Sequence, residues 1–226
     1  MSKLINKYSK TGNLKYISHL DVLRFIQRAV KRAGINAKYS EGFNPHMKTS
    51  FGFPLSLGTE SIGEYFEIEL NEDLSPEEFM ERINAVMPKE MQIIKSSYSE
   101  DAKSLMARCA YAEYIIGIES ESLDMDKLND LLAEMLEEGI IYLREKKNKK
   151  NKLVTKEINT KEYINFLKAE NVNENKAKIQ AVFITTETGS MKVDEFLKLV
   201  AEKTFTIDYH TIMKVDALDK DMKPIL

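Results

Sequence analysis

Residues 16–58 read YISHLDVLRFIQRAVKRAGINAKYSEGFNPHMKTSFGFPLSLG, and the interpretation of the whole chain starts from this stretch. Its first part carries the signals of a helix. Ser18 suits an N-cap, and Asp21 follows three residues later, as in a capping box. Gly34 suits the position just after a helix end. The pattern therefore predicts a helix between Ser18 and Gly34, followed by the loop EGFNPHMK at residues 41–48.

The segments around this helix alternate between strand and helix patterns. Alternating apolar residues predict strands, and the Ser-Pro-Glu-Glu sequence at residues 75–78 predicts the start of a second helix. The order strand–helix–strand–strand–helix–strand is typical of a ferredoxin-like unit. Residues 3–9 and 13–17 are expected to form a strand or hairpin before the first helix. Residues 35–40, 64–70 and 91–98 are the further expected strands, and residues 48–57 are expected as an additional strand or hairpin arm.

The second half of the chain shows a related order. We expect strands at 110–119, 179–185 and 205–217, helices at 125–138 and 193–202, a hairpin of 140–147 with 152–158, and an inserted short helix at 160–170. The sequence therefore predicts an α+β fold with two ferredoxin-like halves in tandem. Their expected bounds are 1–100, with the basic helix and the EGFNPHMK loop, and 109–226, with a basic hairpin.

The composition predicts an ordinary globular protein. Of the 226 residues, 43% are hydrophobic and 31% are charged. No apolar run approaches the roughly 18 residues that a membrane helix needs, and the N-terminus lacks the apolar core of a signal peptide. Cys109 is the lone cysteine, so neither an internal disulfide nor a cysteine cluster is possible. We expect a cytoplasmic protein with no membrane association, no metal and no cofactor.

The charge is distributed unevenly. Residues 1–50 hold ten Lys or Arg and two acidic residues, a net charge of +8, whereas the whole chain carries −3. A basic segment on an acidic protein predicts a local site for a polyanion. The alternative is a solvated helix face without a ligand.

Two groups of residues are candidates for that site. Arg24, Arg28 and Arg32 recur at helical spacing, and guanidinium groups in a row suit phosphates. In the loop, Gly42 and Pro45 stiffen the backbone that presents Asn44, His46 and Lys48. The alternative is a plain turn with Phe43 packed inward.

His19 and His46 could instead act as an acid–base pair. With Asp21 they could hold a metal, but His19 and Asp21 lie two residues apart on a helix, so their side chains diverge.

Residues 144–156, REKKNKKNKLVTK, carry seven cationic residues and one acidic residue. As a hairpin they could contact a nucleic-acid backbone or be a solvated tip.

The sequence also resembles a known family. Residues 7–35, KYSKTGNLKYISHLDVLRFIQRAVKRAGI, and residues 39–70, YSEGFNPHMKTSFGFPLSLGTESIGEYFEIEL, resemble the radical-SAM-associated (radical-SAM-linked) bacterial protein family of unknown function. The resemblance is specific over residues 1–100. It departs at Met47, where the family pattern often has proline. Members occur beside or fused to radical-SAM proteins and near a ribonuclease of the RNase E/G type. The resemblance therefore implies an accessory role and a radical-SAM protein as partner.

Three functions remain open at this point. The first is an RNA-binding or substrate-presenting module that works with a radical-SAM enzyme in RNA modification or processing. Arg24, Arg28, Arg32, Asn44, His46 and Lys48 would then bind RNA. The second is a metal-independent RNA-processing enzyme that uses His19 and His46. The third is a protein–protein adaptor. The sequence lacks the C-x3-C-x2-C pattern of an intrinsic radical-SAM cluster, which favours a non-catalytic role.

Overall fold

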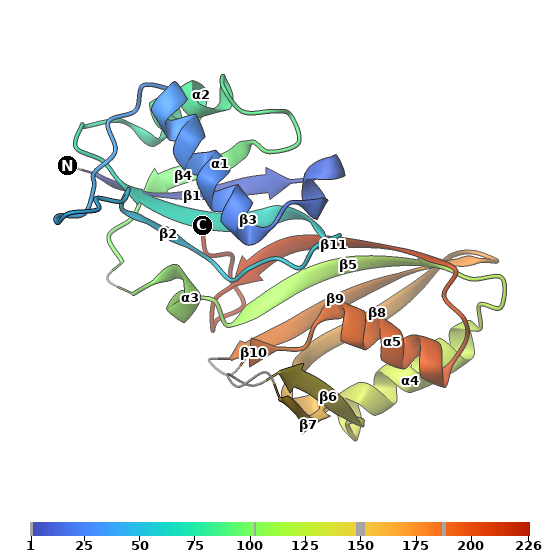
Figure 1. Ribbon diagram of the computed structural model, residues 1–226. Coiled ribbons are helices and arrows are strands. Elements are labelled where there is room, and N and C mark those ends of the chain that lie inside the picture. The colour runs from blue at the N-terminus through green and yellow to red at the C-terminus, as the bar shows by residue number, and fades with distance from the viewer. Residues whose placement is uncertain (1, 102, 148–151, 187–188) are drawn as a thin grey trace. The chain divides into compact units, whose positions relative to one another are not determined.

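The computed structural model has a mixed α/β fold and describes residues 2–101, 103–147, 152–186 and 189–226. The chain forms two compact units (Figure 1). Unit 1 consists of Met1–Ala110 and Met213–Leu226, and unit 2 consists of Tyr111–Ile212. The C-terminal residues therefore fold back into the unit that the N-terminal residues build.

Unit 1 contains a sheet in the order β4-β1-β3, with antiparallel neighbours. The outer edge of β3 pairs with two segments: β2 runs antiparallel to its end, and β11 runs parallel to its start. The elements are β1 (Lys3–Lys10), η1 (Gly12–Tyr16), α1 (His19–Arg32), β2 (Thr49–Phe51), β3 (Glu60–Glu69), α2 (Pro76–Asn84), β4 (Ile93–Tyr98), α3 (Leu105–Arg108) and β11 (Tyr209–Leu218).

The two faces of this sheet bury different sets of side chains, because successive strand residues point to opposite faces. Leu4, Tyr8, Phe66 and Ile68 share one core with the apolar sides of α1 and α2. Ile5 and Tyr65 belong to a second core with Leu105, Cys109, Ala217 and Ile225. Helices α1 and α2 thus cover one face, as Figure 1 also shows.

The helix signals of the sequence are confirmed. The Ser18 hydroxyl accepts a hydrogen bond of 3.2 Å from the Asp21 amide at the start of α1. The helix ends at Arg32, and Gly34 follows with φ = +65°. Ser75 caps α2 in the same way, with Pro76 as the first helical residue.

Unit 2 contains a sheet in which β5 and β8 pair with opposite edges of β9, and β10 pairs with the end of β9. Helices α4 and α5 share one apolar core with this sheet. The predicted hairpin of β6 and β7 is confirmed as a separate two-stranded ribbon. The elements are β5 (Tyr111–Glu119), α4 (Met125–Glu137), β6 (Ile141–Lys147), β7 (Leu153–Asn159), η2 (Thr160–Glu162), β8 (Ile164–Asn173), β9 (Lys176–Thr186), β10 (Gly189–Ser190) and α5 (Val193–Lys203).

Three local predictions are wrong. Residues 160–170 are not a short helix: the single turn η2 is followed by β8, which pairs along β9 and buries Ile164 and Leu167. Residues 13–17 form the 3-10 turn η1 instead of a strand. Residues 35–40 contain only the isolated bridges of Ala37 and Tyr39. For residues 13–17 and 35–40, bonds to residues distant in sequence override the local pattern. Residues 164–170 pair instead with the next strand along the chain. The tandem ferredoxin-like halves and their domain bounds stay predictions.

Candidate nucleic-acid interface

Helix α1 presents a row of cationic side chains to solvent. Its buried residues are Val22, Ile26, Ala29 and Val30, which face the core of unit 1. Arg24, Arg28, Lys31 and Arg32 occupy the other positions and are exposed. The amphipathic pattern of the helix thus places the predicted arginines on its outer side. We call these four residues the basic face.

The residues of the basic face differ in whether their side chains bond to the rest of the fold. The Arg28 side chain forms no hydrogen bond or ion pair with any other described residue. The Arg24 guanidinium lies 3.6 Å from the Asp21 carboxylate, but both side chains are more than half exposed, so this pair is weak. Arg32 donates a hydrogen bond of 3.1 Å to the Val86 carbonyl and lies over the Phe25 ring. Arg24 and Arg28 are therefore the residues best placed to bind a ligand.

The EGFNPHMK loop is closed at its base by hydrogen bonds. The Ser40 amide donates to the His46 carbonyl at 2.8 Å, and the His46 amide donates to the Ser40 hydroxyl at 3.0 Å. Next to this pair, Tyr39 bridges to Met47, whose side chain is buried. Gly42 has φ = +114°, which a residue with a side chain adopts only with strain. The backbone from Ser40 to Met47 is thus fixed at both ends.

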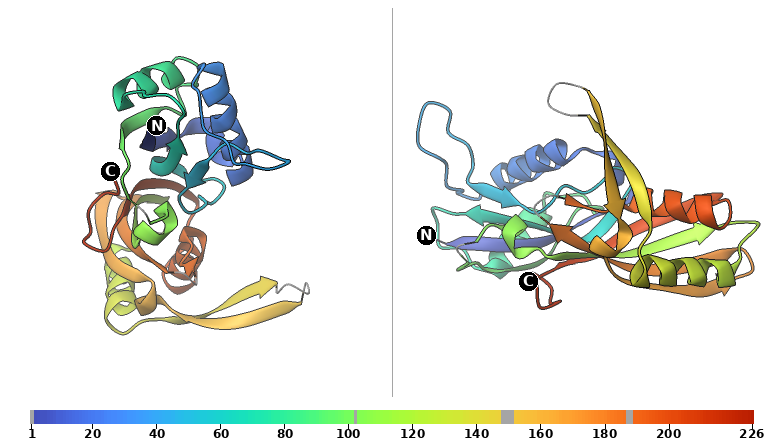
Figure 2. Two further views of the ribbon diagram at one scale, coloured as in Figure 1. Left: turned by 90° about the vertical axis from the view of Figure 1, so that its left-hand side faces the viewer. Right: turned by 90° about the horizontal axis from the view of Figure 1, so that it is seen from below.

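The loop presents its side chains to solvent, which disfavours the alternative of a plain turn with Phe43 packed inward. Residues 41–46 are all exposed, including the predicted site residues Asn44 and His46. The Phe43 side chain has a relative exposure of 108%, so it does not pack inward. Met47, at the position where the family pattern often has proline, is the residue that fixes the loop to the core. The loop extends away from the other elements of unit 1 (Figure 2).

Lys48 lies on the arm that leads from the loop into β2. Its ammonium is 3.8 Å from the Glu69 carboxylate, which Lys38 approaches to 3.1 Å. Lys48 also lines a hollow of about 360 Å³ on unit 1. Lysines and hydroxyl groups dominate the lining of this hollow, which consists of Lys3, Lys48, Thr49, Ser50, Glu67, Ile68, Glu69, Lys103 and Ser104.

His19 is the first residue of α1 and lies partly inside the fold. Its ring packs edge-on against Phe51, with 6.0 Å between the ring centroids. Burial lowers the pKa of His19 below its usual value, the Glu64 carboxylate partly offsets this, and the Lys10 ammonium lowers the pKa further. The fold therefore favours the neutral form of the imidazole.

The structure does not bring His19 and His46 into contact. The His19 ring contacts the Phe51 ring. His46 lies five residues before Phe51, ahead of the segment Lys48 to Phe51 that pairs in extended form. An extended segment spans about 3.3 Å per residue, so the two imidazoles lie toward opposite ends of it. This geometry does not favour a shared acid–base role.

The lowered pKa of His19 predicts a pH-dependent stability. Because the unfolded state binds a proton more readily, the stability is present above the unfolded pKa near 6.5 and is lost as the pH falls through the folded pKa. We expect His19→Gln to lose less melting temperature than the unsubstituted protein between about pH 7.5 and about pH 5.5. Thermal unfolding followed by circular dichroism measures this, with His46→Gln as the matched substitution on the exposed loop. An equal loss in His19→Gln would contradict the assignment.

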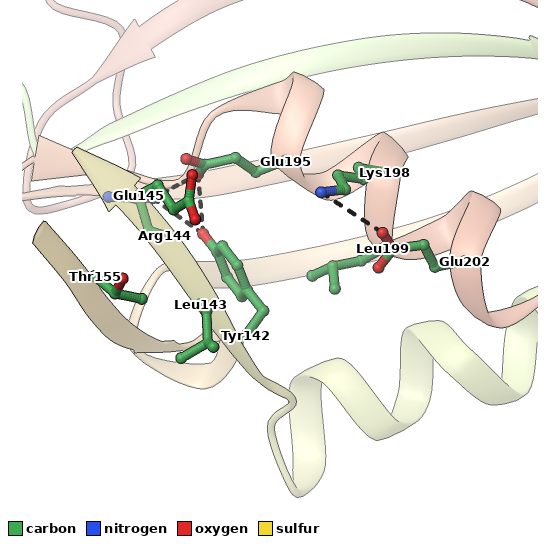
Figure 3. A pocket seen from close by; sticks show the side chains of 9 residues that line it. All are labelled: Tyr142, Leu143, Arg144, Glu145, Thr155, Glu195, Lys198, Leu199 and Glu202. Carbon is green, nitrogen blue, oxygen red and sulfur yellow. Dashed lines mark hydrogen bonds and ion pairs between the residues drawn. The ribbon is translucent and has the colours of Figure 1, made fainter. Parts of the chain in front are cut away.

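The basic hairpin of unit 2 uses Arg144 within the fold. Arg144 forms an ion pair of 2.6 Å with Glu195 and donates to the Tyr142 hydroxyl at 3.0 Å (Figure 3). It also donates to the Ser190 carbonyl at 3.1 Å. Burial, followed by the hydrogen bond to Glu195, raises the pKa of Tyr142 to about 12. Tyr142, Arg144 and Glu195 line a cavity of about 490 Å³ with other residues of β6, β7 and α5, and their bonds join the ribbon to the helix. The tip at residues 148–151 lies outside the described residues.

Sequence reasoning missed two aromatic residues of this surface. Phe43 was considered only in the alternative of a plain turn, and Tyr39 was not singled out, yet Tyr39 is 37% exposed and its ring lies 5.8 Å from the Lys31 ammonium. No local sequence signal indicates that this turn has no neighbouring segment on which Phe43 could pack. Among the described residues, no group of three or more His, Cys, Asp or Glu side chains could hold a metal ion. No helix in the described part of the chain could cross a membrane.

Solved structures show what fold the chain resembles. It is similar to a chain of a Cbf5–Nop10–Gar1 complex, with 11% identity and a TM-score of 0.50 over 95% of this chain and 48% of that chain. A chain of an H/ACA RNP bound to a substrate RNA containing 2′-deoxyuridine gives 10% identity and a TM-score of 0.48 over 95% and 47%. This chain thus spans about half the length of both, and identities this low concern the fold alone.

The remaining comparisons concern sequence. No curated protein matches the chain. The model of the family "Uncharacterized protein conserved in bacteria (DUF2344)" matches residues 3–193, which is most of the chain. The protein therefore belongs to the DUF2344 family of uncharacterized proteins conserved in bacteria.

Proposed function

We propose that this protein is an RNA-binding or substrate-presenting accessory module that works with a radical-SAM enzyme in RNA modification or processing. The observation that carries the RNA part is the basic face of α1, where Arg24 and Arg28 are exposed and Arg28 forms no pair with another described residue. The radical-SAM partner rests only on the sequence resemblance of residues 1–100. The likeness to the Cbf5 complex concerns the fold, so the proposal rests on surface chemistry.

The local charge supports a polyanion as ligand. Arg24 and Arg28 are one helical turn apart, and each guanidinium can donate two parallel hydrogen bonds to a phosphate. Asp21 is the acidic residue of α1, and it already pairs with Arg24 and with the Ser18 hydroxyl. In this proposal Arg24, Arg28 and Arg32 contact phosphates, while Asn44, His46 and Lys48 contact a base, a sugar or the backbone.

The double variant Arg24→Ala, Arg28→Ala tests the proposal. We expect its affinity for single-stranded RNA to fall by about tenfold or more, because two charge-assisted contacts are lost. The slope of log K against log salt should decrease in size by about 1.4, since each phosphate contact on a single strand contributes about 0.7. Fluorescence anisotropy of a labelled oligonucleotide at several salt concentrations measures both quantities.

The matched control is Lys127→Ala with Lys198→Ala, which removes two exposed cations from helices α4 and α5 of unit 2. We expect this control to bind RNA nearly as well as the unsubstituted protein. An equal loss in both double variants would remove the basic face as the binding site. Failure of the unsubstituted protein to bind RNA even at low salt would overturn the function itself.

A further inference from the structure

Phe43 is the most exposed phenylalanine of the protein. Its side chain has a relative exposure of 108%, whereas no other phenylalanine exceeds 38%. Burying such a side chain is worth about 1.5–3 kcal/mol, and the fold forgoes this gain at Phe43. Single exposed apolar residues are common on protein surfaces, so exposure alone does not indicate a site. Whether Phe43 marks a binding site therefore depends on the residues around it.

The loop backbone that carries this ring is fixed at its base. The two hydrogen bonds between Ser40 and His46 close the loop three residues either side of Phe43. Pro45 restricts the backbone just after the ring, and the buried Met47 joins the loop to the core. A group presented on a fixed backbone loses little conformational entropy when it binds, which favours recognition.

Cations lie on the arms of the loop, five residues before and five residues after Phe43 in the sequence. The Lys48 amide donates to the Lys38 carbonyl at 2.8 Å, so these two lysines lie side by side at the base of the loop. Lys31, on the basic face, lies against the ring of Tyr39 on the same arm as Lys38. The nearby acids are Glu41 in the loop and Glu69, which Lys38 and Lys48 share. An exposed aromatic ring among basic residues is typical of surfaces that bind unpaired nucleotides.

We propose that Phe43 is a stacking platform for an unpaired base of single-stranded RNA. This inference rests on the proposed function and specifies which form of RNA the site takes. The bases of a duplex are already stacked within the helix, so only an unpaired base can lie on the ring. Its flanking phosphates reach the cations of the loop arms and of α1, and the exposed Asn44 and His46 contact the base edge.

The absence of tryptophan from the sequence allows a direct test. Phe43→Trp creates a single tryptophan, which can be excited selectively over the ten tyrosines and whose emission is quenched when a base stacks on it. We expect quenching by a single-stranded RNA of about ten nucleotides, and little by a duplex or an abasic strand of equal length. Tyr98→Trp is the control, because Tyr98 is a 51% exposed aromatic residue on β4 of the same unit. Equal quenching at both positions, or equal quenching by the abasic strand, would overturn the platform.

Affinity measurements separate this inference from the proposed function. We expect Phe43→Ala and Phe43→Leu to bind single-stranded RNA roughly 5- to 150-fold more weakly, with an unchanged salt slope and an unchanged stability. Normal RNA affinity in Phe43→Ala would overturn the platform and leave RNA binding by the basic face intact. If that variant instead lost a protein partner from nuclease-treated extract, the ring would belong to a protein interface. No RNA binding by the unsubstituted protein would overturn both proposals.

Discussion

Replacing Glu64 with Gln is expected to lower the free energy of unfolding by about 3–5 kcal/mol. Glu64 and Lys214 form an ion pair of 2.7 Å in which both side chains are less than one-tenth exposed. The Glu64 carboxylate also accepts a hydrogen bond of 3.0 Å from the Ser61 hydroxyl. The fully buried ammonium of Lys10 is a further electrostatic neighbour of this carboxylate. Without the negative charge, two buried cations lose the carboxylate that offsets them.

Glu69→Gln is the matched control for this experiment. Glu69 lies on the same strand and pairs with Lys38 and Lys48, but all three side chains are about one-third exposed. Exposed pairs contribute about 1 kcal/mol or less, so this variant should unfold near the midpoint of the unsubstituted protein. Urea unfolding followed by circular dichroism compares the three proteins. Similar midpoints for Glu64→Gln and Glu69→Gln would show that burial does not make the Glu64 pair important.

The buried lysine links this ion cluster to the candidate interface. The Lys10 ammonium donates to the carbonyls of Lys15 at 3.5 Å and Ile17 at 3.0 Å. Burial lowers the pKa of Lys10, and the Glu64 carboxylate acts in the opposite direction. Because Ile17 directly precedes the Ser18 cap, these bonds fix where α1 begins. The interior of unit 1 thus sets the position of the basic face.

Local sequence signals correctly predicted those elements whose ends are set by contacts within a few residues. The start of α1 follows from Ser18, and the start of α2 follows from Ser75 and Pro76, because a cap bonds within its own turn. The β6–β7 hairpin was predictable because its strands are adjacent in sequence. Residues 164–173 also pair with the next strand along the chain, β9, but this pairing was not predicted because their pattern alone does not exclude a helix.

The charge pattern of the sequence was harder to interpret, because it does not show which cations the fold uses. Lys3 pairs with Glu67 at 2.9 Å, and Lys7 pairs with Asp216 at 2.6 Å. Lys10 is buried. These three residues count toward the +8 of residues 1–50, but their ammonium groups already bind carboxylates or main-chain carbonyls of unit 1. The cations that remain exposed lie mostly on α1 and the loop arms, which narrows the candidate site. The exposure of Phe43 could not be predicted either, because a sequence does not show which segments of the fold lie near a turn.

The last prediction concerns the close approach of β3 and β11. Gly63 lies on β3 between Ser61 and Glu64, and its main chain faces the backbone of β11. A Cβ atom at Gly63 would lie 2.4 Å from the Val215 carbonyl oxygen and 2.5 Å from the Asp216 Cα. These are backbone atoms, so they cannot move aside as the end of a flexible side chain could. Only glycine therefore allows the two strands to come this close.

Gly63→Ala should destabilise the protein by about 3 kcal/mol or more, because it forces β11 away from β3. Such a shift would also disturb the Lys214–Glu64 pair and the bonds of Asp216 with Lys7 and Tyr65. Gly52→Ala is the control, since its Cβ would meet only the Tyr65 carbonyl oxygen at an ordinary 3.7 Å. In urea unfolding, Gly52→Ala should stay within about 1 kcal/mol of the unsubstituted protein. Equal stability of both variants would mean that β11 can shift without breaking these bonds, and the buried ion pairs would then not depend on this contact.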